Sequence, residues 1–294
     1  MRELTDKEMD DWGGVVNYIS HHGVRKSTSN STPLRVVSNS SLNNNNSGHS
    51  FNSILAKGPN SIQPLFNILV MFRTYEEVVV WDIHKAYNVM ETTDKELHCR
   101  RLVWRWGQQD QDWKTYGFTK VHFGDLPAAP LLELTKKAAV EEGRHIDPEV
   151  AEQMEKGYVD DGLGGGKREI IERMVGDVEE IDGQLHYSGV VSQILGKVSM
   201  RPKYMVRSGE TDTRALDKLG GHVLGHTWDP PEDKIRFKLD VDLANRKEKI
   251  RGHQNLVTVD NIDSIANTKM TKRLILSIVS SWYDPLGLIC AITI

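Results

Sequence analysis

Apolar residues recur at helical spacing in three stretches of the chain. These stretches cover residues 62–72, 128–142 and 167–181. Because a helix brings residues i, i+3, i+4 and i+7 to one face, each stretch predicts a helix. Gly143 and Gly183 follow the second and third stretches, where glycine commonly ends a helix. A fourth helix, of mixed face, is expected over residues 271–281, ahead of Asp284 and Pro285.

Shorter apolar runs predict strands. Val78-Val79-Val80-Trp81 is a β-branched run without alternation, as in a strand covered on both faces, and Asp82 follows it directly. Two further pairs of strands are expected, residues 102–106 with 116–123 and residues 220–228 with 234–239. Residues 27–50 are rich in Ser and Asn and are expected to form a loop.

A hairpin is predicted within residues 155–166, centred on Asp160-Asp161-Gly162, because Asp-Gly is a frequent hairpin dipeptide. The run Gly164-Gly165-Gly166 after it is expected to be a flexible loop, with a phosphate-binding loop as the less favoured alternative. Strand, helix, hairpin and helix in this order form the βαββ core of a ferredoxin-like layer. The sequence therefore predicts an α+β fold.

Composition narrows the class of protein. The 294 residues carry a net charge of −4, with 38% hydrophobic and 27% charged residues, which excludes wholesale disorder. A protein that binds nucleic acid usually carries a positive net charge. Any basic surface for nucleic acid must therefore be local in this chain, and residues 246–251 form one small basic cluster. Cys99 and Cys290 provide no disulfide framework, which favours a reducing, intracellular setting.

The ends of the chain carry two further expectations. No signal peptide is expected at the start, and no membrane span, because Tyr283-Asp284-Pro285 interrupts the most apolar stretch, residues 274–294. That stretch stops at Ile294 without a polar closing segment, as in a fragment of a longer chain.

Three carboxylates form the candidate chemical centre. Asp82 ends a predicted strand, whereas Asp160 and Asp161 lie at a predicted hairpin, and the two elements are neighbours in a ferredoxin-like sheet. Carboxylate oxygens suit Mg²⁺, and two such ions can activate a hydroxyl and stabilise a leaving oxygen in phosphoryl transfer. Without a cation the carboxylates would repel one another. The alternative is an ordinary exposed Asp-Gly turn.

Five segments in order resemble the reverse transcriptase of BEL/Pao-type LTR retrotransposons. They are residues 82–87 (Asp-Ile-His-Lys-Ala-Tyr), 123–130 (Phe-Gly-Asp-Leu-Pro-Ala-Ala-Pro), 158–161 (Tyr-Val-Asp-Asp), 224–228 (Leu-Gly-His-Thr-Trp), and 271–273 with 283–288. The similarity runs from Tyr18 to the end of the chain. In the family the first four segments are the first palm motif, the template-facing motif, the catalytic hairpin and the primer grip.

The resemblance implies a right-hand polymerase. Its expected parts are an N-terminal segment with fingers (1–73), a ferredoxin-like palm with inserted fingers strands (74–200), the primer grip and palm end (201–240), and a truncated thumb-proximal or connection region (241–294).

The resemblance also implies residue roles. Asp82, Asp160 and Asp161 would hold two Mg²⁺ ions, which Mn²⁺ could replace, with the carbonyl of Ile83 as an extra ligand. The nucleotide would meet Arg35 at its triphosphate, Tyr87 as the gate against a ribose 2′-hydroxyl, and Phe123 and Gly124 behind it. Leu224, Gly225, His226 and Trp228 would form the primer grip.

Blander readings remain for several of these residues. Tyr87 could instead be a half-buried tyrosine of the palm, and Arg35 could be a solvent-exposed basic residue next to a strand. Lys26 is a weaker candidate for the triphosphate. Lys197 is a candidate proton donor to the leaving pyrophosphate, although a surface lysine is favoured there. His21-His22 has no third metal ligand nearby and is expected to be structural or exposed.

Besides the run Gly164-Gly165-Gly166 after the hairpin, the chain departs from the family pattern at two sites. Asp125-Leu126-Pro127 stands where an apolar-Thr-Cys sequence is usual, and the proline of the motif falls one position late, at Pro130. Asn39 stands where an Asp is usual in the fingers segment. The first departure looks like a mark of a subgroup, and the second weakens the expected contact with the triphosphate.

The implied activity is RNA-directed DNA polymerisation, a nucleotidyl transfer that joins dNTPs to a primer on an RNA or DNA template. Protease, RNase H and integrase would lie outside this chain. In the family, part of the region after the catalytic hairpin is described as a Pao-type peptidase segment, but the sequence shows no catalytic residues of a peptidase there. The implied location is intracellular, in a cytoplasmic virus-like particle with a possible nuclear phase. Two alternatives stay open: a domesticated copy that only binds nucleic acid, and an unrelated Mg²⁺-dependent phosphohydrolase.

Overall fold

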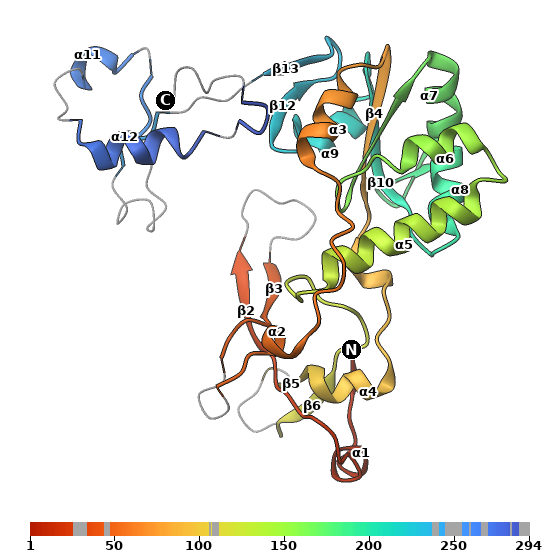
Figure 1. Cartoon of the computed structure of the whole chain (residues 1–294), viewed down its shortest axis with the longest axis vertical. Coiled ribbons are helices and arrows are strands. Elements are labelled where there is room, and N and C mark those ends of the chain that lie inside the picture. Colours follow the sequence, from red (N-terminus) through yellow and green to blue (C-terminus); the bar gives the residue numbers. More distant parts are fainter. Residues whose placement is uncertain are drawn as a thin grey trace. The chain divides into compact units, whose positions relative to one another are not determined.

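The computed structural model describes residues 1–25, 34–43, 48–105, 107, 112–236, 241–244, 255–258, 260–265, 270–282 and 284–287 (Figure 1). The fold is α+β, as expected. Predicted features at Lys26, Trp106, residues 246–251, Tyr283 and Leu288 lie outside the described residues.

The chain divides into two compact units, each built from several stretches. The first unit comprises Met1–Gln63, Trp81–Gly162 and Glu172–Lys203, and the second comprises Pro64–Val80, Leu163–Ile171 and Tyr204–Ile294. The predicted division at residues 73, 200 and 240 stays a prediction. Among the described residues, no helix combines the length and the apolar character that crossing a membrane requires.

The N-terminal part of the first unit holds two small sheets. One has the order β1 (Arg2–Glu3), β6 (Lys114–Gly117), β5 (Arg101–Trp104), and the other pairs β2 (Ser20–Arg25) with β3 (Leu34–Asn39). Short helices accompany them: α1 (Asp6–Asp10), α2 (Phe51–Ile54), α4 (Asp94–Leu97), η1 (Ala86–Val89) and η2 (His98–Arg100). Their core is formed by Ile19, Phe51, Leu102 and Phe118.

The pairing of β5 with β6 confirms the first predicted strand pair, but the second strand is shifted. It ends at Gly117 instead of continuing to Phe123. The N–H of Phe118 still donates to the carbonyl of Arg100, in the register of the ladder, and the residues after it form a loop that is held by other contacts, described below.

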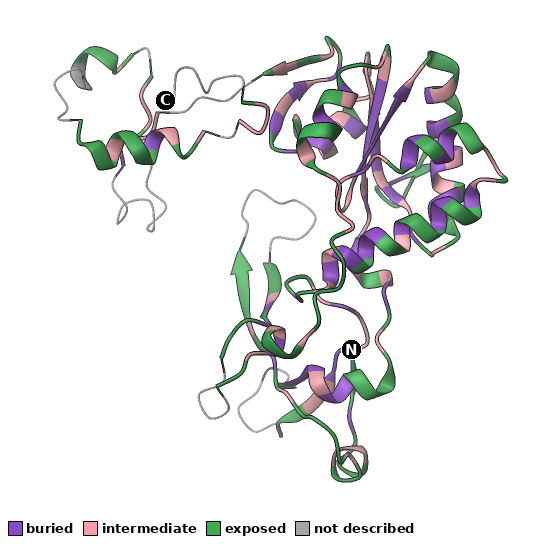
Figure 2. Cartoon of the chain, viewed as in Figure 1, coloured by how far each residue is buried: buried purple, intermediate pink, exposed green. Residues whose placement is uncertain are grey.

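A three-stranded sheet has the order β10 (Pro202–Arg207), β4 (Glu77–Ile83), β7 (Asp161–Gly166). The predicted run Val78 to Trp81 is the buried middle of β4, at most 4% exposed, and appears purple in Figure 2. The N–H of His84 donates to Arg201 at one end of β4 and that of Ser208 to Val78 at the other, so β4 and β10 run antiparallel.

The glycine run forms strand β7, so the prediction of a flexible loop was wrong. Gly162 to Gly165 are buried. Side chains of neighbouring residues fill the space beside them: a Cβ on Gly162 would lie 1.9 Å from Trp81, and one on Gly165 would lie 2.3 Å from Tyr75. Glycine is therefore required by close approach across the sheet, which local sequence patterns do not reveal.

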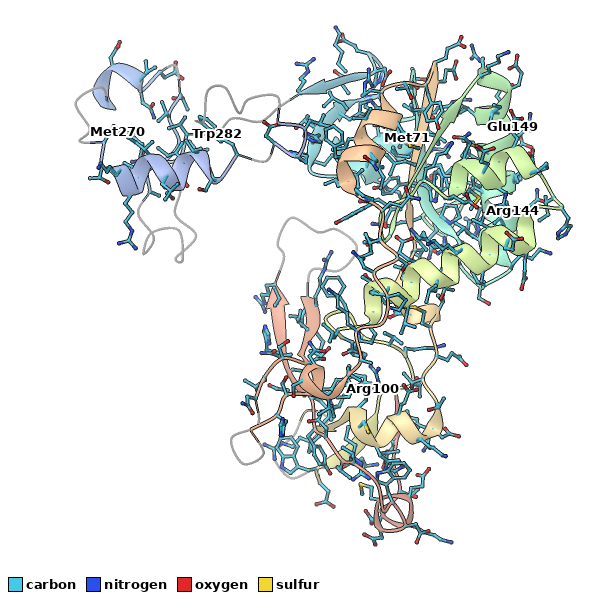
Figure 3. The ribbon with its side chains drawn as sticks, in the orientation of Figure 1. Met71, Arg100, Arg144, Glu149, Met270 and Trp282 are labelled. Carbon is cyan, nitrogen blue, oxygen red and sulfur yellow. The ribbon has the colours of Figure 1, made fainter. Side chains whose placement is uncertain are left out.

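Helix α5 (Ala128–Gly143) agrees with the prediction, and it packs against α6 (Pro148–Met154) and α8 (Val190–Gly196) (Figure 1). The contact with α8 is close, since a Cβ on Gly143 would lie 2.5 Å from Ile194. Arg144, labelled in Figure 3, follows α5 and forms ion pairs with Glu141 and Glu155.

The predicted helix over residues 167–181 is only half as long. Helix α7 (Arg168–Val175) ends before Gly176, whose φ is +64°, and a hairpin of β8 (Val178–Ile181) and β9 (Gln184–Tyr187) follows. A Cβ on Gly176 would lie 2.4 Å from the backbone of Gly189, so this close crossing ends the helix. The predicted helix was too long because Val178 and Ile181 of β8 extend the apolar helical pattern in the sequence past Gly176.

In the second unit, α3 (Leu65–Phe72) and α12 (Lys272–Val279) confirm two predicted helices; α9 (Thr213–Leu219) and α11 (Ile262–Ile265) complete the set described. The predicted strand over residues 220–228 is instead a hairpin of β11 (His222–Val223) and β12 (His226–Asp229). Its turn is made by Leu224 and Gly225, with φ values of +48° and +84°. Strand β12 pairs with β13 (Lys234–Arg236), as expected.

Candidate functional site

The hairpin that carries two of the predicted aspartates is a tight two-residue turn. Tyr158 and Asp161 exchange backbone hydrogen bonds of 2.7 and 2.9 Å, so Val159 and Asp160 form the turn itself. Val159 has a φ of +51°, a region that β-branched residues rarely adopt. The turn was predicted one residue too late, because Asp161 and Gly162 already begin β7.

The turn lies beside the end of β4. The N–H of Ile83 donates to the carbonyl of Asp160 at 3.2 Å. Since Trp81 faces Gly162 on the same pair of strands, β4 and β7 run antiparallel. Asp82 therefore lies on the strand next to the turn of Asp160. The carbonyl of Ile83 as a metal ligand stays a prediction.

Lys203 is the basic residue that contacts the carboxylates. Its Nζ lies 2.8 Å from Oδ2 of Asp82. Sequence reasoning considered Lys197 instead, which is exposed at the end of α8. The apolar run Tyr204-Met205-Val206 after Lys203 is a strand-like signal that could have indicated a strand carrying this lysine.

Burial and mutual repulsion act on the aspartates. Burial, followed by the charges of Asp160 and Asp82, raises the pKa of Asp161 to about 6. Burial also raises the pKa of Asp160, and the charge of Asp82 adds to it. Lys136 and Lys203 oppose both shifts. The three aspartates thus form one electrostatically coupled group with an excess of negative charge.

The oxygen chemistry of this group fits Mg²⁺, which prefers carboxylates. Within the described part of the chain, however, no three His, Cys, Asp or Glu side chains are already gathered into a metal-binding arrangement. Asp82 is instead neutralised by Lys203. The donor set therefore suits the ion by chemistry, with Asp82, Asp160 and Asp161 as the residues that would hold it.

Two aromatic residues meet next to the carboxylates. Tyr87, in η1, makes an edge-to-face contact with Phe123 at 5.6 Å between ring centres. Burial, then the charges of Asp160 and Glu133, raises the pKa of Tyr87 to about 12, so its hydroxyl stays protonated at neutral pH. Phe123 is 71% exposed. Two residues predicted to meet a nucleotide are thus brought together from separate segments.

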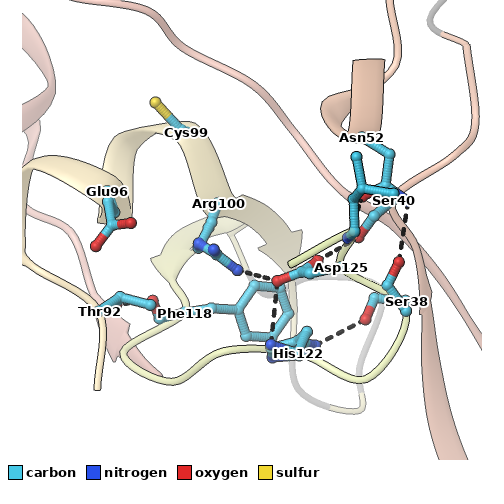
Figure 4. A network of polar contacts seen from close by, with 12 residues as sticks. Ser38, Ser40, Asn52, Thr92, Glu96, Cys99, Arg100, Phe118, His122 and Asp125 are labelled. Atoms are coloured by element: carbon cyan, nitrogen blue, oxygen red, sulfur yellow. Dashed lines mark hydrogen bonds and ion pairs between the residues drawn. The ribbon is translucent and has the colours of Figure 1, made fainter. Parts of the chain in front are cut away.

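Asp125, one of the departures from the family pattern, is a buried anchor (Figure 4). Its carboxylate accepts hydrogen bonds from the guanidinium of Arg100, from Oγ of Ser40 at 2.7 Å and from the backbone of His122 at 3.1 Å. It is 4% exposed. Asp125 therefore has a structural role. It attaches the loop that contains Phe123 to Ser40, which directly follows β3.

Asn52 completes this anchorage from α2. Its amide donates to the carbonyl of Gly124 at 3.0 Å, and its oxygen accepts from the N–H of Leu126 at 2.9 Å. Gly124 has a φ of +99°, a conformation that favours glycine. The loop on both sides of Asp125 is consequently fixed by side chains of α2 and β3.

Other predicted site residues lie elsewhere. Arg35 is exposed on β3 opposite Val24, and its role stays a prediction. Asn39 accepts a hydrogen bond from the N–H of Ser41. His21 and His22 lie on β2; His21 is half-buried and contacts Trp104 at 5.5 Å between ring centres, and His22 is exposed.

The predicted primer-grip residues belong to the second unit. Trp228 is 1% exposed, packs edge-to-face on Phe72 at 5.4 Å and donates to Asp233 at 2.8 Å. His226 is also buried. Of the four predicted primer-grip residues, Gly225 is exposed. Leu224, beside it in the turn, is 9% exposed.

Comparison with known proteins adds no relative. No protein-family model matches the chain, and no curated protein matches it. The assignment of function therefore depends on the residues and on the geometry of the aspartates.

Proposed function

We propose that the chain is the polymerase region of a retrotransposon reverse transcriptase, an enzyme that adds dNTPs to a primer on an RNA or DNA template. One observation carries the proposal. Asp82 lies at the end of a buried strand whose antiparallel neighbour, β7, begins at Asp161, directly after the strained turn of Val159 and Asp160. Adjacent antiparallel strands that each end in a carboxylate are a suitable support for metal-dependent phosphoryl transfer.

The fold is consistent with a ferredoxin-like palm. Helices α5 and α6 lie between β4 and the hairpin in the sequence, and β4 lies between β7 and β10 in the sheet. Tyr158 forms an isolated antiparallel bridge with Asp161, which closes the hairpin. With α7 after the hairpin, this is the order of strand, helix, hairpin and helix that such a layer uses. The fingers and thumb of a right-hand polymerase remain part of the proposal.

Asp82, Asp160 and Asp161 would hold two Mg²⁺ ions. Bound there, the ions would lower the pKa of the primer 3′-hydroxyl and stabilise the pyrophosphate that leaves as the new phosphodiester bond forms. Lys203 would neutralise the charge that remains on the site. Because it bonds directly to Asp82, it would also hold that carboxylate in one orientation.

Tyr87 and Phe123 would receive the nucleotide. The Tyr87 hydroxyl is neutral, so it can lie close to a sugar without adding charge to the aspartates. The packed pair of rings presents a rigid wall, which would exclude a ribose 2′-hydroxyl by its bulk. The anchored loop around Asp125 would keep Phe123 in place against Tyr87.

A second candidate function is a copy that binds nucleic acid without polymerising. The contact between Lys203 and Asp82 favours it, because this ion pair occupies a carboxylate that a metal ion would need. Under this function the aspartates would serve only to shape the surface of the palm.

Primer extension on an RNA template, with dNTPs and Mg²⁺, tests the proposal. We expect extension by the parent chain and a loss of roughly 100-fold or more in Asp160→Asn and Asp161→Asn. The exposed Asp177→Asn serves as the matched control and should be as active as the parent. Equal activity in all four proteins would remove the aspartates from the mechanism. Binding without extension by the parent would favour the second function.

A further inference from the structure

Helix α5 carries a buried ion pair that no step of the proposed function uses. Glu133 and Lys136 are 5% and 9% exposed, and Lys136 Nζ lies 3.0 Å from Glu133 Oε1. Removing two charges from water costs several kcal/mol for each ion, so a buried pair is weak evidence for stability alone. A role other than stability must therefore be sought in the contacts that Glu133 and Lys136 make with neighbouring residues.

Glu133 reaches the aspartate turn. Its Oε1 accepts the backbone N–H of Val159 at 2.7 Å, a charge-assisted hydrogen bond. Val159 is the residue whose φ of +51° strains the turn. A backbone in such a region is strained, and it persists where the surrounding structure determines it. Glu133 is the side chain that bonds to the strained peptide.

Lys136 donates to the same oxygen of Glu133 that accepts the N–H of Val159, and it lies against the same hairpin. A Cβ on Gly157 would lie 3.3 Å from its Nζ and 2.9 Å from the carbonyl of Asp161. The hairpin thus passes directly over the ammonium group, and only glycine leaves room for it. Burial lowers the pKa of Lys136, whereas the charge of Glu133 opposes that shift.

We propose that Glu133 is a positioning residue, oriented by Lys136, which holds the Val159–Asp160 turn in the conformation that presents Asp160 and Asp161 to metal ions. The proposal rests on the function proposed above. Glu133 acts through the peptide of Val159, so its loss should weaken metal binding before it affects anything else in the reaction.

The test removes the pair without leaving one charge buried. Glu133→Met/Lys136→Met has nearly the same volume and no acceptor for Val159. Glu133→Gln/Lys136→Met keeps a neutral acceptor. Val159→Gly in the first double variant removes the strain instead, because glycine adopts a positive φ readily. Glu142→Gln/Lys137→Met, at exposed positions of the same helix, is the matched control.

Mn²⁺ affinity, measured by electron paramagnetic resonance without nucleic acid, is the first readout. We expect roughly 10-fold weaker binding in Glu133→Met/Lys136→Met, the scale found when a group that orients metal ligands is removed. The glutamine variant and the Val159→Gly variant should each recover part of the loss. Unchanged affinity in the first variant, or a loss that neither change recovers, would overturn the proposal, as would a parent that binds no Mn²⁺.

The Mg²⁺ dependence of primer extension is the second readout. The concentration for half-maximal extension should rise in the first variant and return toward the parent's value in the other two. If the parent binds Mn²⁺ and the affinities follow the expected order while no protein extends a primer, the positioning role stands and the polymerase assignment fails. If all of them extend with the parent's Mg²⁺ dependence, the positioning role fails and the polymerase assignment stands.

Discussion

At the scale of single residues, burial and two neighbouring carboxylates act on Asp161 in the same direction, and together they raise its pKa from 3.8 to about 6. The folded state therefore binds this proton more tightly than the unfolded chain does. The stability that it contributes is complete below pH 3.8 and is lost as the pH rises through 6.

We predict that, in the presence of a chelator, the free energy of unfolding of the parent chain falls between pH 4 and pH 7 relative to Asp161→Asn. The expected difference is on the order of 1–3 kcal/mol. Urea denaturation of both proteins across this range measures it. Parallel curves for the two proteins would contradict the raised pKa. Saturating Mg²⁺ should reduce the difference, because a bound cation favours the ionised carboxylate.

Lys203 is a second residue whose role can be tested separately. In Lys203→Met the charge of Asp82 loses its partner, so the metal-free chain should be less stable and a bound cation should compensate. We therefore predict a larger increase in Tm on addition of Mg²⁺ for Lys203→Met than for the parent, measured by calorimetry. Lys197→Met, at an exposed lysine, should behave as the parent. Equal increases in all three would exclude Lys203 as the counterion of Asp82.

At the scale of elements, strand β7 is formed by residues that ordinarily weaken strands, and it is stabilised by what covers them. Trp81 lies over Gly162 and Tyr75 over Gly165. In other strands the side chains of the strand itself fill the space beside the backbone. Here Trp81 on β4 and Tyr75, which precedes β4, fill that space. Glycine in a strand interior commonly marks such a close approach.

Gly162→Ala should therefore destabilise the chain by about 1–3 kcal/mol, because the added methyl group overlaps Trp81 and forces it to move. Chemical denaturation measures the change. Gly196→Ala is the matched control, since nothing lies within 4 Å of a Cβ at that glycine, and it should be tolerated. If Gly162→Ala is as stable as Gly196→Ala, the close approach of β4 and β7 is wrong.

At the scale of the whole molecule, two compact units are each held by their own contacts. The buried ion pair of Arg100 and Asp125 lies in the first unit, as do Ser40, Asn52 and His122 around it. It joins segments that are far apart in the sequence. The pair of Trp228 with Phe72 is the corresponding contact in the second unit.

Asp125→Asn should destabilise the first unit by roughly 3–5 kcal/mol, because it leaves the buried guanidinium of Arg100 without its counterion. Hydrogen exchange measured by mass spectrometry should show lost protection around Ser40 and in β5, with β12 affected less. The exposed Asp10→Asn is the control. Equal loss of protection in both units would show that the network does not belong to the first unit alone.

The sequence by itself determined the elements whose signals are local. Helix α5 and the buried strand β4 were predicted because helical period and a run of β-branched residues act over a few neighbouring positions. Asp82, Asp160 and Asp161 were grouped by the order of the predicted strand and hairpin and by the family resemblance, because Asp160 and Asp161 alone read as an ordinary Asp-Gly turn. The α+β class followed from the order of those elements.

Tertiary structure decided everything that depends on contacts between distant segments. The end of α7 at Gly176 and the glycine strand β7 depend on close approaches to other segments. The bond from Glu133 to the aspartate turn and that from Lys203 to Asp82 join residues that no local pattern connects. The physical reason is that helix period and turn preference are short-range, whereas close packing and charge pairing exist only after the chain has folded.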